Sequence, residues 1–221
     1  MFIGHYGAAM AAKRWTPRLS LGWLFLAVQL VDVLFAVFVL GGIEKVRIVP
    51  GFTATNSYDL YFMPYTHGLV GALVWSALAA LAARALLRGQ DRAAAALVVG
   101  LCVFSHWLLD APMHTPDMPL LGDGSPKVGL GLWHHRTLTI AIELAAFAAG
   151  ALIWLRTTGG LARARTGTVV FLVALAALAL ATPFMPPPSG PTEMAFSMLA
   201  GYFVLAGAAA WVDRSRSRPP S

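Results

Sequence analysis

The sequence predicts an all-α fold, a polytopic helical membrane protein with about six transmembrane helices and a short, half-inserted N-terminal helix. Three observations predict this fold. The chain of 221 residues is 58% hydrophobic and only 12% charged, whereas an ordinary soluble domain is about a quarter charged. Its apolar residues form runs of about 20, the length that a helix needs to span a bilayer. Its charged residues lie in small groups between those runs.

The elements follow in order along the chain. Residues 3–14, IGHYGAAMAAKR, are too short to span a bilayer and are expected to enter it part-way. Six runs are expected to span it, at residues 20–41, 64–87, 93–112, 131–155, 168–185 and 193–212. Residues 1–213 should form a single helical domain, and the basic tail 214–221 should be disordered. Because Lys13 and Arg14 follow the first apolar stretch, no cleavable signal peptide is expected.

Lys and Arg residues predict how the chain is oriented. Four segments hold three basic residues each, twelve of the 16, at residues 13–18, 84–92, 156–165 and 214–218. The alternate connections hold only Lys45, Arg47 and Lys127. By the positive-inside rule the C-terminus should be cytoplasmic and the sparsely charged loops should face outward. Because the net charge of +6 is spread over separate loops, membrane lipids and not nucleic acid are the expected partners.

Ionisable side chains inside the apolar runs are the candidate functional residues. A charge in the middle of a spanning helix costs about 2.5–3.5 kcal/mol on insertion scales, so its presence there suggests a function. Residues 102–114, CVFSHWLLDAPMH, provide two such groups. On a helix, the spacing of four puts His106 and Asp110 on the same face.

Three further residues can approach that face from neighbouring segments. At 1.5 Å per residue, Asp32 lies about 18 Å above the start of its span and His106 lies about 20 Å above its own. His5 lies about 12 Å above Lys13, at the inner end of the half-inserted helix, and His67 enters from the outer side. These side chains can therefore converge in the middle-to-outer part of the bundle.

Imidazoles and carboxylates together are the ligands of Zn²⁺ and of harder cations such as Mn²⁺ and Fe²⁺. No Lys or Arg lies deep enough in the first three spans to pair with Asp32 or Asp110. A divalent metal, Zn²⁺ first, is therefore the expected cofactor. The alternative for each residue is a hydrogen-bonded group that serves only helix packing.

The remaining polar residues are weaker candidates. Pro112 breaks the helix before His114, which is therefore expected at the rim of the site or in no role at all. His134 and His135 cannot both face inward, so at most one contributes. Glu143 is expected to bond a nearby threonine or a neighbouring backbone group. Three acids are expected to be solvated loop carboxylates: Glu44, Asp59 and Asp117.

Six segments, in this order, resemble a family of small bacterial integral-membrane proteins described as permease-like or as membrane-bound metal-dependent hydrolases: GHYGAAMAAKR, LFLAVQLVDVLF, GIEKVRIVPGFTA, PYTHG, SHWLLDAPMHTPDMPL and GLGLW. The resemblance covers residues 1–135 and extends, more distantly, to zinc-dependent phospholipase C. It implies a bacterial cytoplasmic (inner) membrane protein. By position, the implied metal ligands are His5, Asp32, His67, His106 and Asp110. The sequence departs from the broader hydrolase group at FMPYTHG, which lacks a His-Arg pair and has Gly68 where that group has serine.

The function that the resemblance implies is hydrolysis of a lipid or lipid-linked phosphoester, or an ester, near the outer leaflet. The metal would activate a water molecule and polarise the bond that is cleaved. Asp110 or Asp32 would act as ligand or general base, and His114 or His134 would protonate the leaving group.

Three functions are alternatives to hydrolysis. An ion- or proton-coupled transporter or permease would use the histidines and aspartates as a relay. However, the sequence contains neither an internal repeat nor a mid-span Gly/Pro pair, which such proteins often have. The two carboxylates argue against a haem site, and a purely structural membrane protein is the third alternative.

Overall fold

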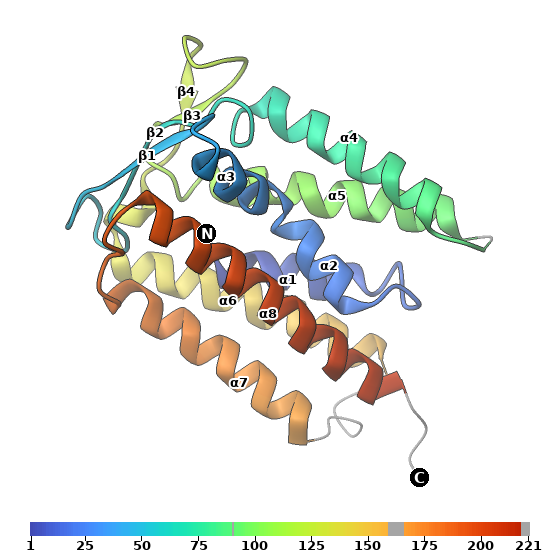
Figure 1. Ribbon diagram of the computed structural model, residues 1–221. Helices are drawn as coiled ribbons and strands as arrows, with labels where there is room; N and C mark the ends of the chain where they lie inside the picture. Colours follow the sequence, from blue (N-terminus) through green and yellow to red (C-terminus); the bar gives the residue numbers. More distant parts are fainter. Residues whose placement is uncertain (90, 159–165, 218–221) are drawn as a thin grey trace.

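The computed structural model describes residues 1–89, 91–158 and 166–217, and it confirms the all-α, polytopic fold (Figure 1). The α-helices among these residues are α1 (Ile3–Ala12), α2 (Leu21–Val28), α3 (Leu30–Leu40), α4 (Leu69–Leu86), α5 (Arg92–Asp110), α6 (Arg136–Thr157), α7 (Thr166–Ala181) and α8 (Pro191–Ser217). Two single 3₁₀ turns, η1 (Leu132–His134) and η3 (Thr182–Phe184), precede α6 and follow α7.

The expectation of about six spans agrees with the helices of the structure. Five helices, α4 to α8, are long and apolar enough to cross a membrane. The consecutive helices α2 and α3 form a sixth span if they are counted together, although they are bent by 55° relative to each other. The bend lies at Gln29, a buried residue in the middle of the predicted run 20–41.

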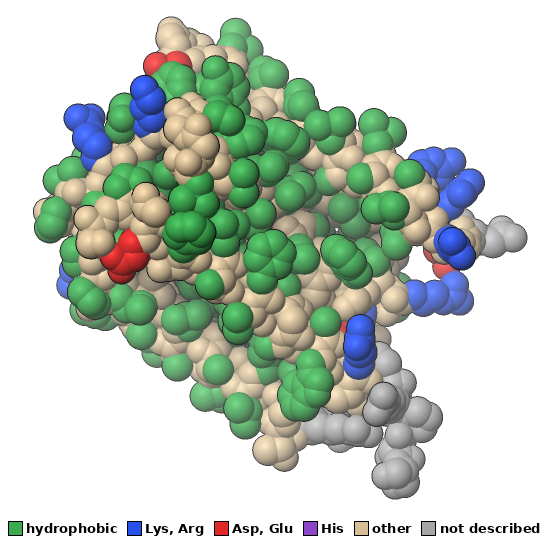
Figure 2. Space-filling view, in the orientation of Figure 1, with side chains coloured by type: hydrophobic (Ala, Val, Ile, Leu, Met, Phe, Trp, Pro, Cys, Tyr) green, Lys and Arg blue, Asp and Glu red, His purple; other side chains and the backbone are tan. Residues whose placement is uncertain are grey.

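The connections divide between the two ends of the bundle. At one end, here called the hairpin end, two short antiparallel pairs form: β1 (Lys45–Ile48) with β2 (Tyr58–Phe62), and β3 (Met118–Pro119) with β4 (Lys127–Val128). Among the described residues, the connections at the opposite end, here called the basic end, carry most of the Lys and Arg side chains (Figure 2). Successive long helices run in alternate directions, as a multi-pass topology requires (Figure 1).

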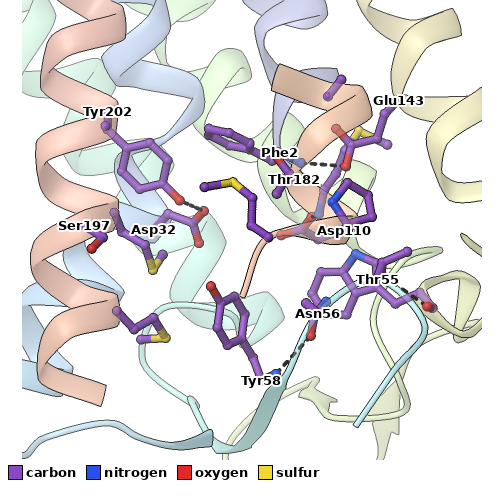
Figure 3. A pocket seen from close by; sticks show the side chains of 18 of the residues that line it. Phe2, Asp32, Thr55, Asn56, Tyr58, Asp110, Glu143, Thr182, Ser197 and Tyr202 are labelled. Carbon is purple, nitrogen blue, oxygen red and sulfur yellow. Dashed lines mark hydrogen bonds and ion pairs between the residues drawn. The ribbon is translucent and has the colours of Figure 1, made fainter. Parts of the chain in front are cut away.

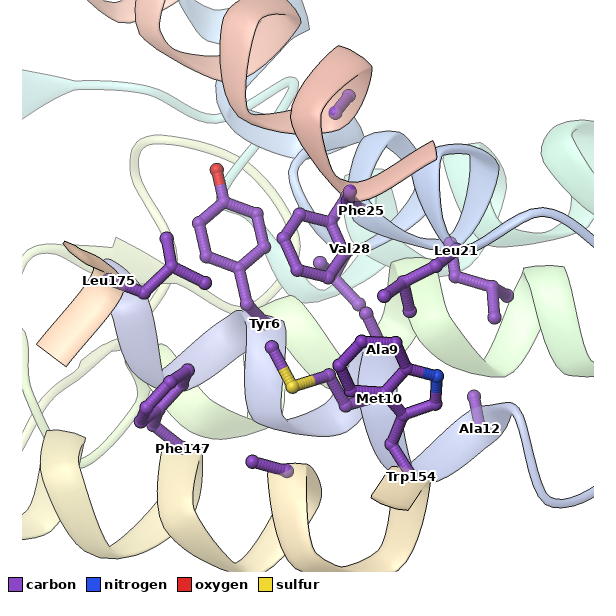
Figure 4. Close-up of a cluster of buried hydrophobic side chains, with 14 of the residues drawn as sticks. Tyr6, Ala9, Met10, Ala12, Leu21, Phe25, Val28, Phe147, Trp154 and Leu175 are labelled. Atoms are coloured by element: carbon purple, nitrogen blue, oxygen red, sulfur yellow. The ribbon is translucent and has the colours of Figure 1, made fainter. Parts of the chain in front are cut away.

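The N-terminal helix α1 lies inside the bundle and not at its edge. Its ten residues measure about 15 Å, too little to cross a bilayer. Tyr6 of α1 stacks on Phe25 of α2 with ring centroids 4.2 Å apart. Trp154 of α6 is fully buried in the same hydrophobic cluster (Figure 4). The backbones of α1 and α6 are in contact at Gly7 and Gly150. They are so close that a Cβ added to Gly150 would lie only 2.0 Å from the Gly7 carbonyl oxygen. Small residues at such a crossing let two helices approach closely.

The last turn of α1 is tied to the end of α8 at the basic end. Lys13, expected in a loop, is buried, and its Nζ donates to Asp213 Oδ2 at 2.9 Å. The amide of Leu21 donates to the same oxygen at 3.0 Å. Helix α8 then continues to Ser217, so residues 214–217 of the predicted tail are helical, and residues 218–221 lie outside the described residues.

Candidate metal centre

Six ionisable side chains that are far apart in the sequence meet near the hairpin end of the bundle. We call them the His/Asp cluster: His5, Asp32, His67, His106, Asp110 and His114. Helices α1, α3 and α5 provide four of them, and the turns before α4 and after α5 provide the other two. Five are buried, and Asp32 is half-buried. The fold thus brings together all five ligands expected from the sequence, with His114 beside them.

Asp110 lies at the middle of the cluster. Its Oδ1 is 3.1 Å from His5 Nε2, and its Oδ2 is 3.0 Å from His106 Nε2. The same Oδ2 is 3.5 Å from His114 Nε2 and 3.9 Å from His67 Nε2. All four imidazoles therefore turn the same ring nitrogen, Nε2, toward this carboxylate.

Asp32 forms a second carboxylate corner. Its Oδ1 lies 3.3 Å from His67 Nε2 and 3.5 Å from His106 Nε2. Its Oδ2 accepts a hydrogen bond of 2.6 Å from the hydroxyl of Tyr202 on α8. Tyr202 is a site residue that the sequence analysis missed, because a tyrosine within an apolar run carries no charge that would single it out.

The opposite ring nitrogens, Nδ1, face groups outside the cluster. His106 Nδ1 lies 2.7 Å from the carbonyl oxygen of Val28, and His114 Nδ1 lies 2.9 Å from Asp117 Oδ1. A carbonyl and a carboxylate only accept hydrogen bonds, so both Nδ1 atoms carry a proton. Such partners fix the tautomer and the ring orientation of histidines that bind metals. Asp117, expected to be solvated, is instead half-buried against His114.

His67 is held by a longer chain of hydrogen bonds. Its Nδ1 lies 2.9 Å from Thr66 Oγ1, which donates its own proton to Glu44 Oε2 at 2.6 Å. The hydroxyl must therefore accept the Nδ1 proton of His67. Glu44 also accepts the amides of Tyr65 and Thr66 at 2.8 and 2.9 Å. The expectation that Glu44 is solvated was wrong: it is 1% exposed and organises the turn before α4.

The bend at Gln29 explains why a backbone carbonyl is free to hold His106. In an unbroken helix the Val28 carbonyl would accept the amide four residues later, but α2 ends at Val28. Its oxygen instead accepts the Nδ1 proton of His106 from α5. Neither Gly nor Pro lies at the break, so no local residue type predicts it.

The cluster could hold a metal ion, and its geometry fits one. Ligands of a tetrahedral cation at 2.0–2.2 Å lie about 3.3–3.6 Å apart, close to the 3.0–3.5 Å between Nε2 and carboxylate atoms for four of these pairs. His106 Nε2 makes no hydrogen bond of ordinary geometry with any described residue. Because the proton of His106 is on Nδ1, the Nε2 lone pair of the neutral imidazole points at lone pairs of the Asp110 and Asp32 carboxylates, and these lone pairs repel one another. A cation between the atoms removes this repulsion.

The start of α1, the helix that carries His5, is held by the Glu143 carboxylate and by a contact with Asp110. The carboxylate of Glu143 on α6 accepts the amides of Phe2 and Gly4 at 3.0 and 3.1 Å. Glu143 thus satisfies backbone donors at the beginning of α1 and does not bond the threonines of its own helix. The amino nitrogen of Met1 also contacts Asp110 Oδ1, a basic partner that a count of Lys and Arg did not include.

The structure does not bring His134 to the cluster. Gly131 adopts a left-handed conformation with φ of 71°, and the 3₁₀ turn that follows exposes both His134 and His135. Trp133, not His134, packs on His114, with ring centroids 4.1 Å apart. The expected role of His134 as a proton donor therefore has no geometric basis.

A cavity of about 500 Å³ opens onto one side of the cluster (Figure 3). Asp32, His67, Asp110 and His114 form its polar wall. Much of the remaining lining consists of apolar side chains of α7, α8 and the turn between these helices, including Leu178, Ala179, Met185, Met194, Met198 and Leu205. Tyr58 of β2 directs its hydroxyl into the cavity (Figure 3). The cavity thus combines a polar part, at the His/Asp cluster, with a largely apolar part.

Two groups of the site lie outside the spanning helices and have shifted pKa values. Burial opposes a charge on His114, but the carboxylates of Asp117 and Asp110 outweigh it and raise the pKa of the imidazole. A metal ion would replace that proton. Burial and the nearby Asp32 carboxylate raise the pKa of the Tyr58 phenol, which therefore remains a hydrogen-bond donor.

Fold and site together define a class: a polytopic helical membrane protein with a buried His/Asp cluster that could hold a metal ion. No protein-family model, curated protein or solved structure matches the chain. The resemblance to membrane-bound metal-dependent hydrolases therefore stays a prediction that rests on the quoted segments.

Proposed function

We propose that this protein is a metal-dependent hydrolase that cleaves a phosphoester or ester of a membrane lipid. One observation carries the proposal: the His/Asp cluster lines a cavity whose remaining lining is largely apolar. Such a cavity matches an amphiphile, with its head group at the cluster and its hydrocarbon chain along α7 and α8. The volume of about 500 Å³ lies within the range of about 300–1,000 Å³ for small-molecule sites.

A hydrocarbon chain suits the apolar wall for an energetic reason. Each methylene group transferred from water gains about 0.8 kcal/mol, but a chain that is already in the bilayer gains little more. The apolar wall therefore selects for chain shape and lets a lipid reach the cluster without leaving the membrane. Val204, which also lines the cavity, lies on a part of α8 that is exposed on the outside of the bundle.

The chemistry divides between the metal and the chain. A divalent cation, Zn²⁺ first and Mn²⁺ or Fe²⁺ as alternatives, supplies an activated water molecule and polarises the bond to be cleaved. Asp32, oriented by Tyr202, and Asp110 hold it together with the imidazoles. Tyr58 takes the place of His134 as the group that donates a hydrogen bond to the substrate, because its hydroxyl faces the cavity.

The proposal is tested with purified protein and a panel of lipid substrates. Stripping with a chelator should abolish the release of a water-soluble head group from phospholipids or lipid-linked phosphates, and Zn²⁺ or Mn²⁺ should restore it. Asp110→Asn should lose at least 100-fold in turnover because it removes one carboxylate of the cluster. Asp123→Asn is the matched control, since Asp123 is an exposed loop carboxylate that pairs with Lys127. Folded, metal-loaded protein without turnover on the whole panel would refute the proposal.

One observation favours the alternative, an ion- or proton-coupled transporter. The bend at Gln29 breaks a spanning helix next to the cluster, and transporters use the free carbonyls of broken helices to bind ions. Here, however, the Val28 carbonyl is already bound by His106. Ion flux into proteoliposomes that depends on Asp110, in the absence of lipid turnover, would favour the transporter.

A further inference from the structure

We infer that the His/Asp cluster is a two-cation site in which Asp110 bridges the two positions. The inference deepens the proposed function, rests only on its cation-binding part, and does not depend on which bond is cleaved. It follows from the distances between the ligand atoms of the six side chains.

The ligand atoms are too widely spread for one cation. At ligand distances of 2.0–2.2 Å, two atoms bound to the same cation lie at most about 4.4 Å apart. The described residues form three groups whose ligand atoms all lie within 4.8 Å: His5 with His106 and Asp110, Asp32 with His67 and His106, and His67 with Asp110 and His114. Because none of these groups contains both His5 and His114, we assign these two imidazoles to different cations.

The imidazole lone pairs suffice for two cations that each bind two imidazoles. His67, His106 and His114 donate through Nδ1, so each has one lone pair, on Nε2, and cannot bridge. If His106 joins His5 at one position and His67 joins His114 at another, every imidazole is used once. The group around Asp32 then has no imidazole left for a third cation, and Asp32, which shares no group with His5, His114 or Asp110, stays a charged neighbour of the two positions.

Asp110 has the geometry of a bridge. Its Oδ1 faces His5 at 3.1 Å, whereas its Oδ2 faces His114 at 3.5 Å and His67 at 3.9 Å. The two oxygens of one carboxylate thus point toward the two positions. Its Oδ2 also approaches His106 at 3.0 Å, which keeps the two positions close together. Hydrolytic two-metal sites have separations of about 3.5–4 Å.

The two positions differ in access. His5 and His106 are fully buried, stack on each other with centroids 4.0 Å apart, and are absent from the lining of the cavity. His67, His114 and Asp32 do line it. The inner position is therefore enclosed, and the outer position is the one that substrate can reach.

The charge of a loaded cluster selects the substrate. Two divalent cations carry +4, and the carboxylates of Asp32 and Asp110 carry −2, so the loaded cluster has a net charge of +2. Adding the nearest other charged groups, the carboxylates of Glu143 and Asp117 and the amino group of Met1, leaves a net charge of +1. An anionic phosphoester compensates this charge, whereas a neutral carboxylic ester does not. The two-cation site thus favours the phosphoester among the proposed substrates.

The experiment measures metal content directly. Purified full-length protein is stripped with chelator, reloaded with Mn²⁺ or Zn²⁺ and dialysed, and the metal per chain is determined by elemental analysis. The wild type should bind two equivalents. Two Mn²⁺ ions bridged by a carboxylate are magnetically coupled, so the wild type should also give a coupled paramagnetic resonance spectrum. This second readout needs no variant.

Variants then separate the positions. His5→Ala and His114→Ala should each reduce the metal content from two equivalents to one, with the uncoupled spectrum of an isolated Mn²⁺. Asp110→Ala should lose both equivalents. His134→Ala is the matched control: it removes an exposed histidine at the same end of the bundle and should retain two.

The outcomes distinguish this inference from the proposed function. One equivalent in the wild type, with an uncoupled spectrum, overturns the two-cation site and leaves a metal-dependent hydrolase possible. No metal at all overturns both. Two equivalents that persist in His5→Ala overturn the assignment of the inner position.

Discussion

At the scale of single residues, the histidines of the cluster depend on partners that are not metal ligands themselves. Thr66, Asp117 and the Val28 carbonyl each accept an Nδ1 proton and so aim one Nε2 at the cluster. Glu44 in turn accepts the hydrogen bond that the Thr66 hydroxyl donates. Outer groups of this kind change metal affinity about 10- to 100-fold when they are removed.

Thr66→Val is therefore expected to weaken metal binding about 10- to 100-fold without removing a ligand. Valine keeps the shape of threonine but cannot accept the His67 proton, and it leaves Glu44 without its 2.6 Å hydrogen bond. The affinity is measured by competition with a chromophoric chelator. Thr16→Val is the control, because Thr16 is also buried but bonds only a helix carbonyl near the basic end. Equal affinities for both variants would contradict the prediction.

The sequence predicted the residues of the His/Asp cluster better than the groups that orient them. His106 and Asp110 stand out because charge inside an apolar run is costly. Glu44 and Asp117 lie in polar loops, where a carboxylate is normally solvated, and only the folding of those loops over the bundle buries them. Tyr202 is uncharged and was missed for that reason.

At the scale of elements, α1 carries His5 into the bundle and its placement depends on close backbone contact. Gly7 and Gly150 allow α1 to lie directly on α6, and the Glu143 carboxylate fixes where α1 begins. The bond from Lys13 to Asp213 fixes its other end. Ten residues are thus held at both ends and in the middle.

Gly150→Ala is expected to destabilise the protein by about 1–3 kcal/mol, the usual cost of overpacking. The new Cβ would lie 2.0 Å from the Gly7 carbonyl oxygen, so α1 must shift and take His5 with it. Thermal unfolding in detergent should show a lower Tm, and metal affinity should fall in parallel.

Gly207→Ala on α8 provides the control for this change. A Cβ at Gly207 meets nothing within 4 Å, so the same substitution should leave both Tm and metal affinity unchanged or slightly raise Tm. A Gly150→Ala protein with unchanged metal affinity would show that α1 does not need this contact to place His5.

Hydropathy predicted the long helices but not the interruption of the first one. The run 20–41 is apolar throughout, and Gln29 alone gives no reason to place a bend there. The bend depends instead on tertiary contacts: Gln29 donates to the Phe2 carbonyl, and His106 takes the Val28 carbonyl. Both partners come from other helices, so no local pattern could reveal them.

At the scale of the whole molecule, the alternation of basic and hairpin connections defines an axis. The cluster lies toward the hairpin end, so the positive-inside rule predicts that it lies near the outer leaflet. We expect a fluorescent reporter fused after residue 221 to be active in the cytoplasm, and a phosphatase reporter inserted at Gly122–Gly124 to be active outside it. The opposite pair of results would reverse the proposed orientation.

The bend between α2 and α3 links the proposed metal centre to the bilayer. The Val28 carbonyl is available to His106 only while the two helices are bent, because a straight helix would use that oxygen internally. By thermodynamic reciprocity, cation loading stabilises the bend and any force that straightens the segment weakens loading. Bilayer thickness and lateral pressure act on the length of such a segment, so occupancy of the centre should respond to the mechanical state of the surrounding lipid.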